Sequence, residues 1–131
     1  MTLLVSAHPK ALGAYAVTLS GEINGRTFSI LENKLDQLLE EKPNLIVLDM
    51  AEVTYLSSVG IRVILKTRKA LAAHAGKLVF MNLQPQIKKV FEIINALPSM
   101  RVFKDLREMD AYLDRMQRKA AGAPEDGDEA V

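Results

Sequence analysis

Residues 45–65 read LIVLDMAEVTYLSSVGIRVIL, and this stretch decides the fold. It opens with a continuous apolar run, Leu45–Leu48, which is typical of a strand covered on both faces. From Ile61 to Ala72, apolar residues recur at helical spacing, which predicts a helix. The stretch therefore predicts a buried strand that leads through Ser57 and Ser58 into a helix.

Strand and helix patterns alternate along the rest of the chain. The alternating segment Tyr15–Ser20, closed by Gly21, predicts a half-buried strand, and Leu3–Val5 predicts a weaker strand that precedes it in a hairpin. Phe28 begins an amphipathic helix of about 13–15 residues that stops before Pro43. The helix that begins at Ile61 is predicted to end near Gly76, which would serve as its C′ glycine. After it, the sequence predicts a strand at Leu78–Met81, a helix from Pro85 to Ile94, a short strand at Val102–Phe103 and a helix from Leu106 to Met116.

The predicted elements define one folded domain. Strands and helices that alternate after a leading hairpin predict an α/β fold with a small mixed, mostly parallel β-sheet. We expect about four to five strands with about four helices packed on them. The periodicity stops at about Ala120, and residues 125–131 contain four acidic residues. We therefore expect the domain to span residues 1–119 and residues 120–131 to form a disordered acidic tail.

The composition leaves few groups that could do chemistry. The chain has 131 residues, and its 17 basic and 16 acidic residues give a net charge of +1, which favours neither nucleic acid nor an anionic membrane. It has no cysteine, its only histidines are His8 and His74, and its aromatic fraction of 5% is small for stacking on bases. We therefore expect a binding protein with no metal and no cofactor rather than an enzyme. No apolar stretch reaches the ~20 residues of a spanning helix and the N-terminus lacks a signal-peptide pattern, so we expect a cytoplasmic protein with no membrane insertion.

Two serines lie at the predicted junction between strand and helix. Ser57 suits an N-cap, whose hydroxyl oxygen accepts a hydrogen bond from an otherwise unpartnered backbone N–H. Ser58, on the first turn beside Gly60, is then expected to expose its hydroxyl where free N–H groups and the positive end of the helix dipole converge. A phosphoryl group there, with a charge of about −1.5 to −2, would be stabilised locally. The residues alone leave simple capping and phosphorylation both open.

The same residues carry a resemblance to a known family. Ile46–Met50 followed by Tyr55–Leu65 resembles the signature of the STAS domain, the fold of bacterial anti-sigma factor antagonists. Ser20–Asn24 resembles the second-strand motif of that family, and Gly76–Phe80 falls where a later element of the family would lie. The resemblance covers residues 3 to 116, so the domain over residues 1–119 is expected to be STAS-like.

This resemblance implies a phosphorylation-switched binding protein. In the family the phosphorylated residue is a Ser or Thr just before x-Gly-apolar, which places it on Ser58. Many phosphorylated members have Asp before that serine and Ser or Thr after it, whereas this chain has Ser57 and Val59. The unphosphorylated protein would bind an anti-sigma factor that is also a serine kinase, and so release a sigma factor. Phosphorylation would break the complex, a PP2C-type phosphatase would restore it, and ATP and magnesium would belong to the kinase.

A second function stays open beside this one. The chain could be a STAS scaffold without a phosphorylation switch, such as a subunit of a signalling assembly or a lipid-transport complex, with Ser58 only as a cap. Both functions use the same surface. The expected partner-binding residues are Glu22, Asn24, Ser57, Ser58, Val59, Gly60, Ile61, Arg62 and Lys66.

The charged residues in the sequence around and after Ser58 are all basic. Between Val53 and Phe91 the sequence has no Asp or Glu but seven basic residues. Solvated helix faces are one explanation for this pattern. The other is that Arg62 and Lys66, close to Ser58, attract an acidic surface on the partner.

Overall fold

The computed structural model describes residues 2–96 and 106–122. Four strands form one sheet in the order β1-β2-β3-β4. The strands β1 and β2 pair antiparallel, whereas β2–β3 and β3–β4 pair parallel. The predicted mixed, mostly parallel sheet is therefore confirmed. The strands are β1 (Leu4–Pro9), β2 (Ala14–Ile23), β3 (Leu45–Leu56) and β4 (Lys77–Met81).

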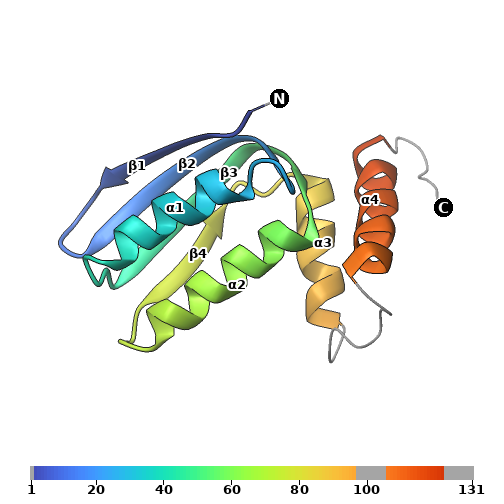
Figure 1. The fold of residues 1–131 in the computed structure, drawn as a ribbon. Helices are drawn as coiled ribbons and strands as arrows, with labels where there is room; N and C mark the ends of the chain where they lie inside the picture. The colour runs from blue at the N-terminus through green and yellow to red at the C-terminus, as the bar shows by residue number, and fades with distance from the viewer. Residues whose placement is uncertain (1, 97–105, 123–131) are drawn as a thin grey trace.

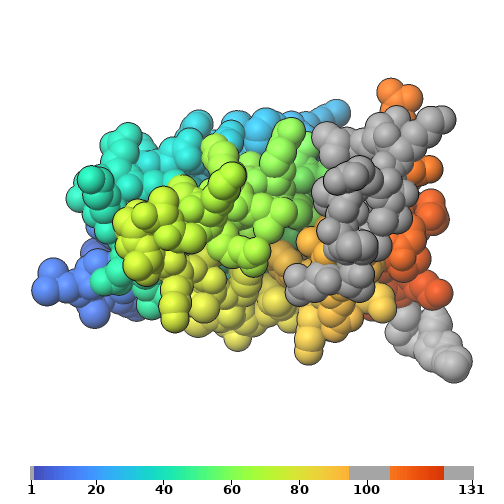
Figure 2. Space-filling model, turned by 90° about the horizontal axis from the view of Figure 1, so that it is seen from below, coloured from blue at the N-terminus to red at the C-terminus, as the bar shows by residue number. Residues whose placement is uncertain are grey.

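Within the described residues, four helices accompany the sheet. The helices α1 and α2 lie side by side across one face of the sheet, whereas α3 and α4 pack against each other near the end of β3 (Figure 1). In the space-filling view, α2 runs along the middle of one side of the molecule, with α1 beside it and α3 at one end (Figure 2). The helices are α1 (Phe28–Leu39), α2 (Ser58–Ala72), α3 (Pro85–Ala96) and α4 (Leu106–Gly122).

The hydrophobic core lies between the sheet and the helices. Alternate residues of β2 and β3 point toward the helices and are buried, which is the period-2 pattern of a strand. The matching stripes on α1 and α2 recur every three or four residues. The fully buried side chains include Val17, Leu19, Leu31, Leu35, Ile46, Leu48, Met50, Ile61, Ile64 and Leu71.

The strand β2 continues past Gly21, where the sequence predicted its end. Gly21 has φ +125° and lies at a register shift against β3, so it forms a bulge instead of a stop. A Cβ at this position would come within 2.5 Å of the Thr2 carbonyl oxygen. Because β2 reaches Ile23, which pairs with Leu56, it carries Glu22 and the following turn to the start of α2.

The predicted role of Gly76 as a C′ glycine is wrong. The residue with a left-handed backbone after α2 is Ala75, at φ 66°, and Gly76 N donates a hydrogen bond to Leu71 O at 2.7 Å. A Cβ on Gly76 would lie 2.9 Å from Pro43 O, so a glycine is needed here for close packing of two backbone segments.

Two further predictions concern the C-terminal region. The predicted strand at Val102–Phe103 lies outside the described residues. The helix α4 continues to Gly122, so the first three residues of the predicted tail, 120–122, are helical, and Ala120 and Ala121 are favourable helix residues. Residues 123–131 lie outside the described part. Within residues 2–96 and 106–122, no helix is long and apolar enough to cross a membrane, and no cluster of three His, Asp or Glu could hold a metal ion.

Candidate functional site

The two predicted serines lie where β3 passes into α2, at residues Tyr55–Ser58, which we call the β3–α2 junction. Ser57 has an extended backbone and is the N-cap of α2, as the sequence predicts. Its N–H donates to Ile23 O at 2.9 Å, so the end of β2 holds the start of the helix. The structure thus brings the junction next to the turn that contains Glu22 and Asn24.

The turn after β2 is held by its own polar groups. Thr27 Oγ1 donates to Glu22 O at 2.7 Å and accepts from Asn24 N at 2.9 Å. The Asn24 side chain donates to Glu22 Oε1 at 3.3 Å and accepts from Arg26 N at 2.9 Å. Glu22 and Asn24 are half-buried, and these bonds fix them as one edge of the predicted partner surface.

The predicted cap bond from the Ser57 hydroxyl is absent. No side-chain cap hydrogen bond forms at Ser57. Instead, Asp110 of α4 accepts a hydrogen bond from Ser58 N through Oδ1 at 2.8 Å. A carboxylate is a stronger acceptor than a hydroxyl, and its charge is favourable at the positive end of the helix dipole. The cap of α2 therefore comes from a residue 52 positions away along the chain.

Both serine hydroxyls are buried, so the predicted exposure of the Ser58 hydroxyl is wrong for this conformation. Ser57 is 7% exposed and Ser58 is 3% exposed. Neither Oγ atom has a hydrogen-bond partner in the described structure. A buried hydroxyl without a partner costs about 1–3 kcal/mol. The junction therefore holds two polar groups in a state that local packing alone does not favour.

Gly60 and Ile61 serve packing rather than the surface. A Cβ on Gly60 would come within 2.6 Å of both Ile23 Cγ2 and Leu56 Cδ1, so only glycine lets α2 start this close to the strands. Ile61 is 1% exposed and belongs to the core. Both residues are buried in this structure, and their contact with a partner stays a prediction. Val59 is half-buried and Arg62 is exposed, so both remain on the predicted surface.

Three polar side chains of α4 face the β3–α2 junction, and sequence reasoning missed them. Asp110, Asp114 and Gln117 are spaced by four and three residues, which places them on one face of the helix. Gln117 accepts from Leu56 N at 2.8 Å and donates to Leu56 O at 2.7 Å. The available signal was Gln117 itself, a polar residue four positions after Leu113 in an otherwise apolar stripe.

Tyr55 also lies against this face of α4. Burial raises the pKa of Tyr55 to about 12, and the negative charge of Asp114, to which its hydroxyl is hydrogen-bonded, adds to the shift. A cavity of about 350 Å³ lies here, lined by residues that include Glu22, Tyr55 and Asp114. The neutral phenol is thus part of the contact between β3 and α4.

Glutamine side chains take the place of a neighbouring strand along the second half of β3. The pairing of β4 with β3 ends at Asp49 and Met81. Beyond it, Gln84 donates to Ala51 O at 2.7 Å and Gln86 donates to Thr54 O at 3.2 Å. Together with Gln117 at Leu56, these side chains satisfy backbone groups that would otherwise lack partners.

The two basic residues near Ser58 differ in their surroundings. Lys66 donates to Glu32 Oε2 of α1, and its Nζ lies 3.7 Å from Asp36 Oδ1. The hydrogen bond to Glu32 is the main reason that the pKa of Lys66 is raised. Arg62 is exposed and forms no ion pair with any described residue. The charge of Lys66 is therefore paired with acidic neighbours on α1, whereas Arg62 has no ion-pair partner among the described residues. That either residue attracts a partner stays a prediction.

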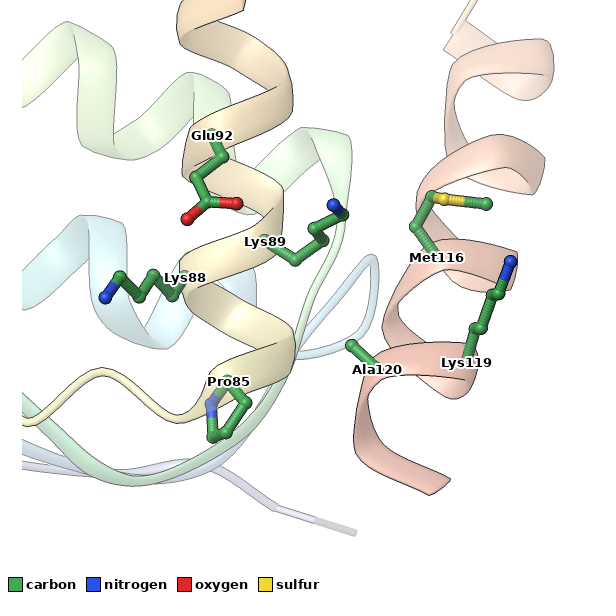
Figure 3. Close-up of a pocket in the computed structure, with 7 residues that line it drawn as sticks. All are labelled: Pro85, Lys88, Lys89, Glu92, Met116, Lys119 and Ala120. Atoms are coloured by element: carbon green, nitrogen blue, oxygen red, sulfur yellow. The ribbon is translucent and has the colours of Figure 1, made fainter. Parts of the chain in front are cut away.

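A second groove lies between α3 and α4, away from the serines. Its volume is about 450 Å³, and three lysines contribute to its lining together with Glu92 and Met116. In the close-up, Lys89 extends from α3 toward α4 (Figure 3). None of the residues that line this groove belongs to the β3–α2 junction.

The fold and the junction define a SpoIIAA-like STAS fold, a four-stranded mixed sheet with four helices in which the third strand leads through the serine pair into a helix. The family model of the STAS domain matches residues 7–109, and the chain belongs to this family. It is 35% identical over 81 residues to a Bordetella bronchiseptica protein named as an anti-sigma factor antagonist, BtrV. The match covers 62% of this chain and 70% of BtrV.

Solved structures of low sequence identity share the fold. An anti-sigma factor antagonist from Mycobacterium paratuberculosis matches with a TM-score of 0.63 at 22% identity, over 76% of this chain and 88% of that one. The antagonist SpoIIAA matches in its unphosphorylated form with a TM-score of 0.60 at 19% identity, over 69% and 83%. The phosphorylated form of SpoIIAA from Bacillus gives a TM-score of 0.60 at 18% identity, over 70% and 83%.

Proposed function

We propose that this chain is an anti-sigma factor antagonist that is switched by phosphorylation of Ser58. When Ser58 is unmodified, the chain binds an anti-sigma factor serine kinase and thereby releases a sigma factor in the cytoplasm. The kinase holds the ATP and phosphorylates Ser58, which breaks the complex, and a PP2C-type phosphatase reverses the modification. The chain itself acts as a binding partner and substrate, not as an enzyme.

One observation carries this proposal. Ser58 is the first residue of α2 in a STAS domain whose relative BtrV is named as an anti-sigma factor antagonist. The backbone N–H groups and the dipole at a helix N-terminus suit a phosphoryl group. SpoIIAA, which shares the fold, has been solved in a phosphorylated form, so this fold accommodates a phosphorylated state.

Phosphorylation changes the surface in sign as well as in shape. The exposed Arg62 and the half-buried Val59 lie on the first turns of α2, beside the turn that contains Glu22 and Asn24. An acidic partner group attracted by Arg62 would meet a phosphoryl charge of about −1.5 to −2 after modification. A loss of about 1.4 kcal/mol already weakens binding tenfold, so one repelled contact is enough to act as a switch.

The second candidate function is the STAS scaffold without a switch. It is favoured by the burial of Ser58, which is 3% exposed, and by the Asp110 carboxylate that already caps its N–H. In this function Ser58 only fills space at the start of α2, and the domain serves as a subunit of a larger signalling or transport assembly.

A phosphorylation experiment separates the two functions. The protein is incubated with kinase-type anti-sigma factors, ATP and magnesium, and the modified residue is mapped by mass spectrometry. Ser58→Ala should bind the kinase without being released, and Ser58→Asp should bind at least tenfold more weakly. Ser57→Ala is the matched control and should still be phosphorylated. Absence of phosphate on Ser58, together with wild-type binding by Ser58→Asp, would support the scaffold instead.

A further inference from the structure

We propose that α4 is an intramolecular cover of the β3–α2 junction, held closed by Asp110 and Gln117, and that it has to move away before Ser58 is modified or bound. The inference rests on the proposed function for its role in regulation. The cover itself is a property of the fold that can be measured without any partner.

The contacts of α4 with the junction are few and specific. Asp110 accepts from Ser58 N at 2.8 Å, and Gln117 makes two hydrogen bonds to the Leu56 backbone at 2.8 Å and 2.7 Å. Leu113 on the same helix is fully buried, so an apolar side chain accompanies the polar ones. Residues on both sides of Ser57 are thus hydrogen-bonded to one helix, and the hydroxyls of Ser57 and Ser58 between and beside these bonds are buried.

The closed state contains an unfavourable feature that opening relieves. The hydroxyls of Ser57 and Ser58 have no partner in the described structure. When α4 moves away, water can reach both oxygens and satisfy them. The polar bonds of Asp110 and Gln117 are likewise replaced by bonds to water. The helix α4 is therefore suited to local opening at a lower free energy than global unfolding.

The carboxylate of Asp110 and a phosphoryl group on Ser58 exclude each other. Asp110 Oδ1 already accepts from the N–H of the residue that would carry the phosphate. Two anions at this half-buried place would repel each other strongly. A phosphate on Ser58 is thus expected to keep α4 open. An unmodified junction is closed until a kinase or another partner takes the place of the helix. Because the partner binds only the open molecules, its apparent affinity is reduced to the open fraction of its intrinsic value.

Amide hydrogen exchange of the full chain tests the cover directly. Each variant removes one contact of α4, and exchange is measured at the amide that is held by the other contact (crossed exchange). Gln117→Leu is read at the Ser58 amide, which is bonded to Asp110, and Asp110→Ala is read at the Leu56 amide, which is bonded to Gln117. If α4 opens as a unit, each variant should speed exchange at the distant amide at least tenfold. Lys119→Ala, an exposed residue of the same helix, is the control and should change neither amide. Acceleration only at the amide whose own acceptor was removed would overturn the cover.

The wild-type chain supplies a measurement that does not depend on the folding of any variant. The Leu56 and Ser58 amides should exchange with similar protection, and both should exchange at least tenfold faster than core amides such as that of Leu48. Protection of both amides equal to that of Leu48 would show that α4 opens only by global unfolding, and the cover would be rejected.

A kinase assay distinguishes failure of the cover from failure of the proposed function. With a kinase-type anti-sigma factor and ATP, Asp110→Ala should be phosphorylated on Ser58 at least threefold faster than wild type, and Lys119→Ala at the wild-type rate. Equal rates in all three proteins, with unchanged crossed exchange, would reject the cover and leave the phosphorylation switch intact. Crossed exchange as expected, with no phosphate in any protein, would reject the switch and leave the cover intact.

Discussion

Between the sheet and the helices α1 and α2 the buried side chains are apolar, and residues such as Leu35 and Leu48 are fully enclosed. At the β3–α2 junction Ser57 and Ser58 are buried, and so is Gln117 of α4, which is hydrogen-bonded to Leu56. In the first region, burial of apolar surface stabilises each side chain. In the second, stability depends on hydrogen bonds from residues far along the chain, and two hydroxyls lack partners. The junction is therefore the less stabilised of the two regions, which fits the functional role proposed for it.

Truncation of the core should give the largest loss of stability. Leu48 is fully buried in β3, so Leu48→Ala removes apolar contacts and leaves a cavity. We expect the free energy of unfolding to fall by about 2–5 kcal/mol, measured by urea denaturation. Leu12→Ala is the matched control, because Leu12 is 97% exposed and should show almost no change. Equal losses in the two variants would contradict the position of the core.

A methyl group at Gly60 should give the next largest loss of stability. This residue lies where the apolar core meets the β3–α2 junction. Gly60→Ala places a Cβ within 2.6 Å of Ile23 and Leu56, so the start of α2 has to shift. Overpacking of this kind costs about 1–3 kcal/mol, which urea denaturation can measure. The control is Gly25→Ala, where a Cβ has nothing within 4 Å. A Gly60→Ala protein as stable as wild type would show that the junction has room to spare.

The two regions also differ in how far the sequence predicted them. Apolar periodicity was enough for the order of strands and helices, because it depends only on neighbouring residues. The capping preference of serine placed Ser57 correctly as the N-cap, and the resemblance to the STAS family marked Gly60 within the motif. Apolar periodicity could not show that Asp110 caps α2 or that Gln117 binds Leu56, because those contacts join residues 52 and 61 positions apart. The burial of Ser58 follows from these long-range contacts, and so it was missed.

Removal of the hydroxyl from two buried residues of α2 should change the stability of the protein in opposite directions. Thr67 Oγ1 donates to Val63 O at 2.9 Å, whereas Ser58 Oγ has no partner in the described structure. Ser58→Ala removes a buried polar group without a bond and should raise the free energy of unfolding by about 1 kcal/mol. Thr67→Val removes a bonded hydroxyl of similar shape and should lower it by about 0.5–1.5 kcal/mol. A destabilised Ser58→Ala protein in urea denaturation would mean that its hydroxyl is bonded in solution.

The smallest expected effect on stability comes from the titration of Tyr55, whose side chain lies in the contact between β3 and α4. Its pKa is raised from 10.0 to about 12 by burial first and by Asp114 second. Because the unfolded chain loses this proton at the lower pH, the neutral phenol stabilises the folded state fully below about pH 10, and the contribution falls as the pH rises toward about 12. Phenolate absorbance should therefore show a late-titrating component that Tyr55→Phe removes. Asp114→Asn should lower its pKa, since the repelling charge is gone. A Tyr55 that titrates near 10 in the wild type would mean that α4 has already moved away from β3 at that pH. The hydrogen bonds of Asp110 and Gln117 would then be too weak to hold the helix against the strand.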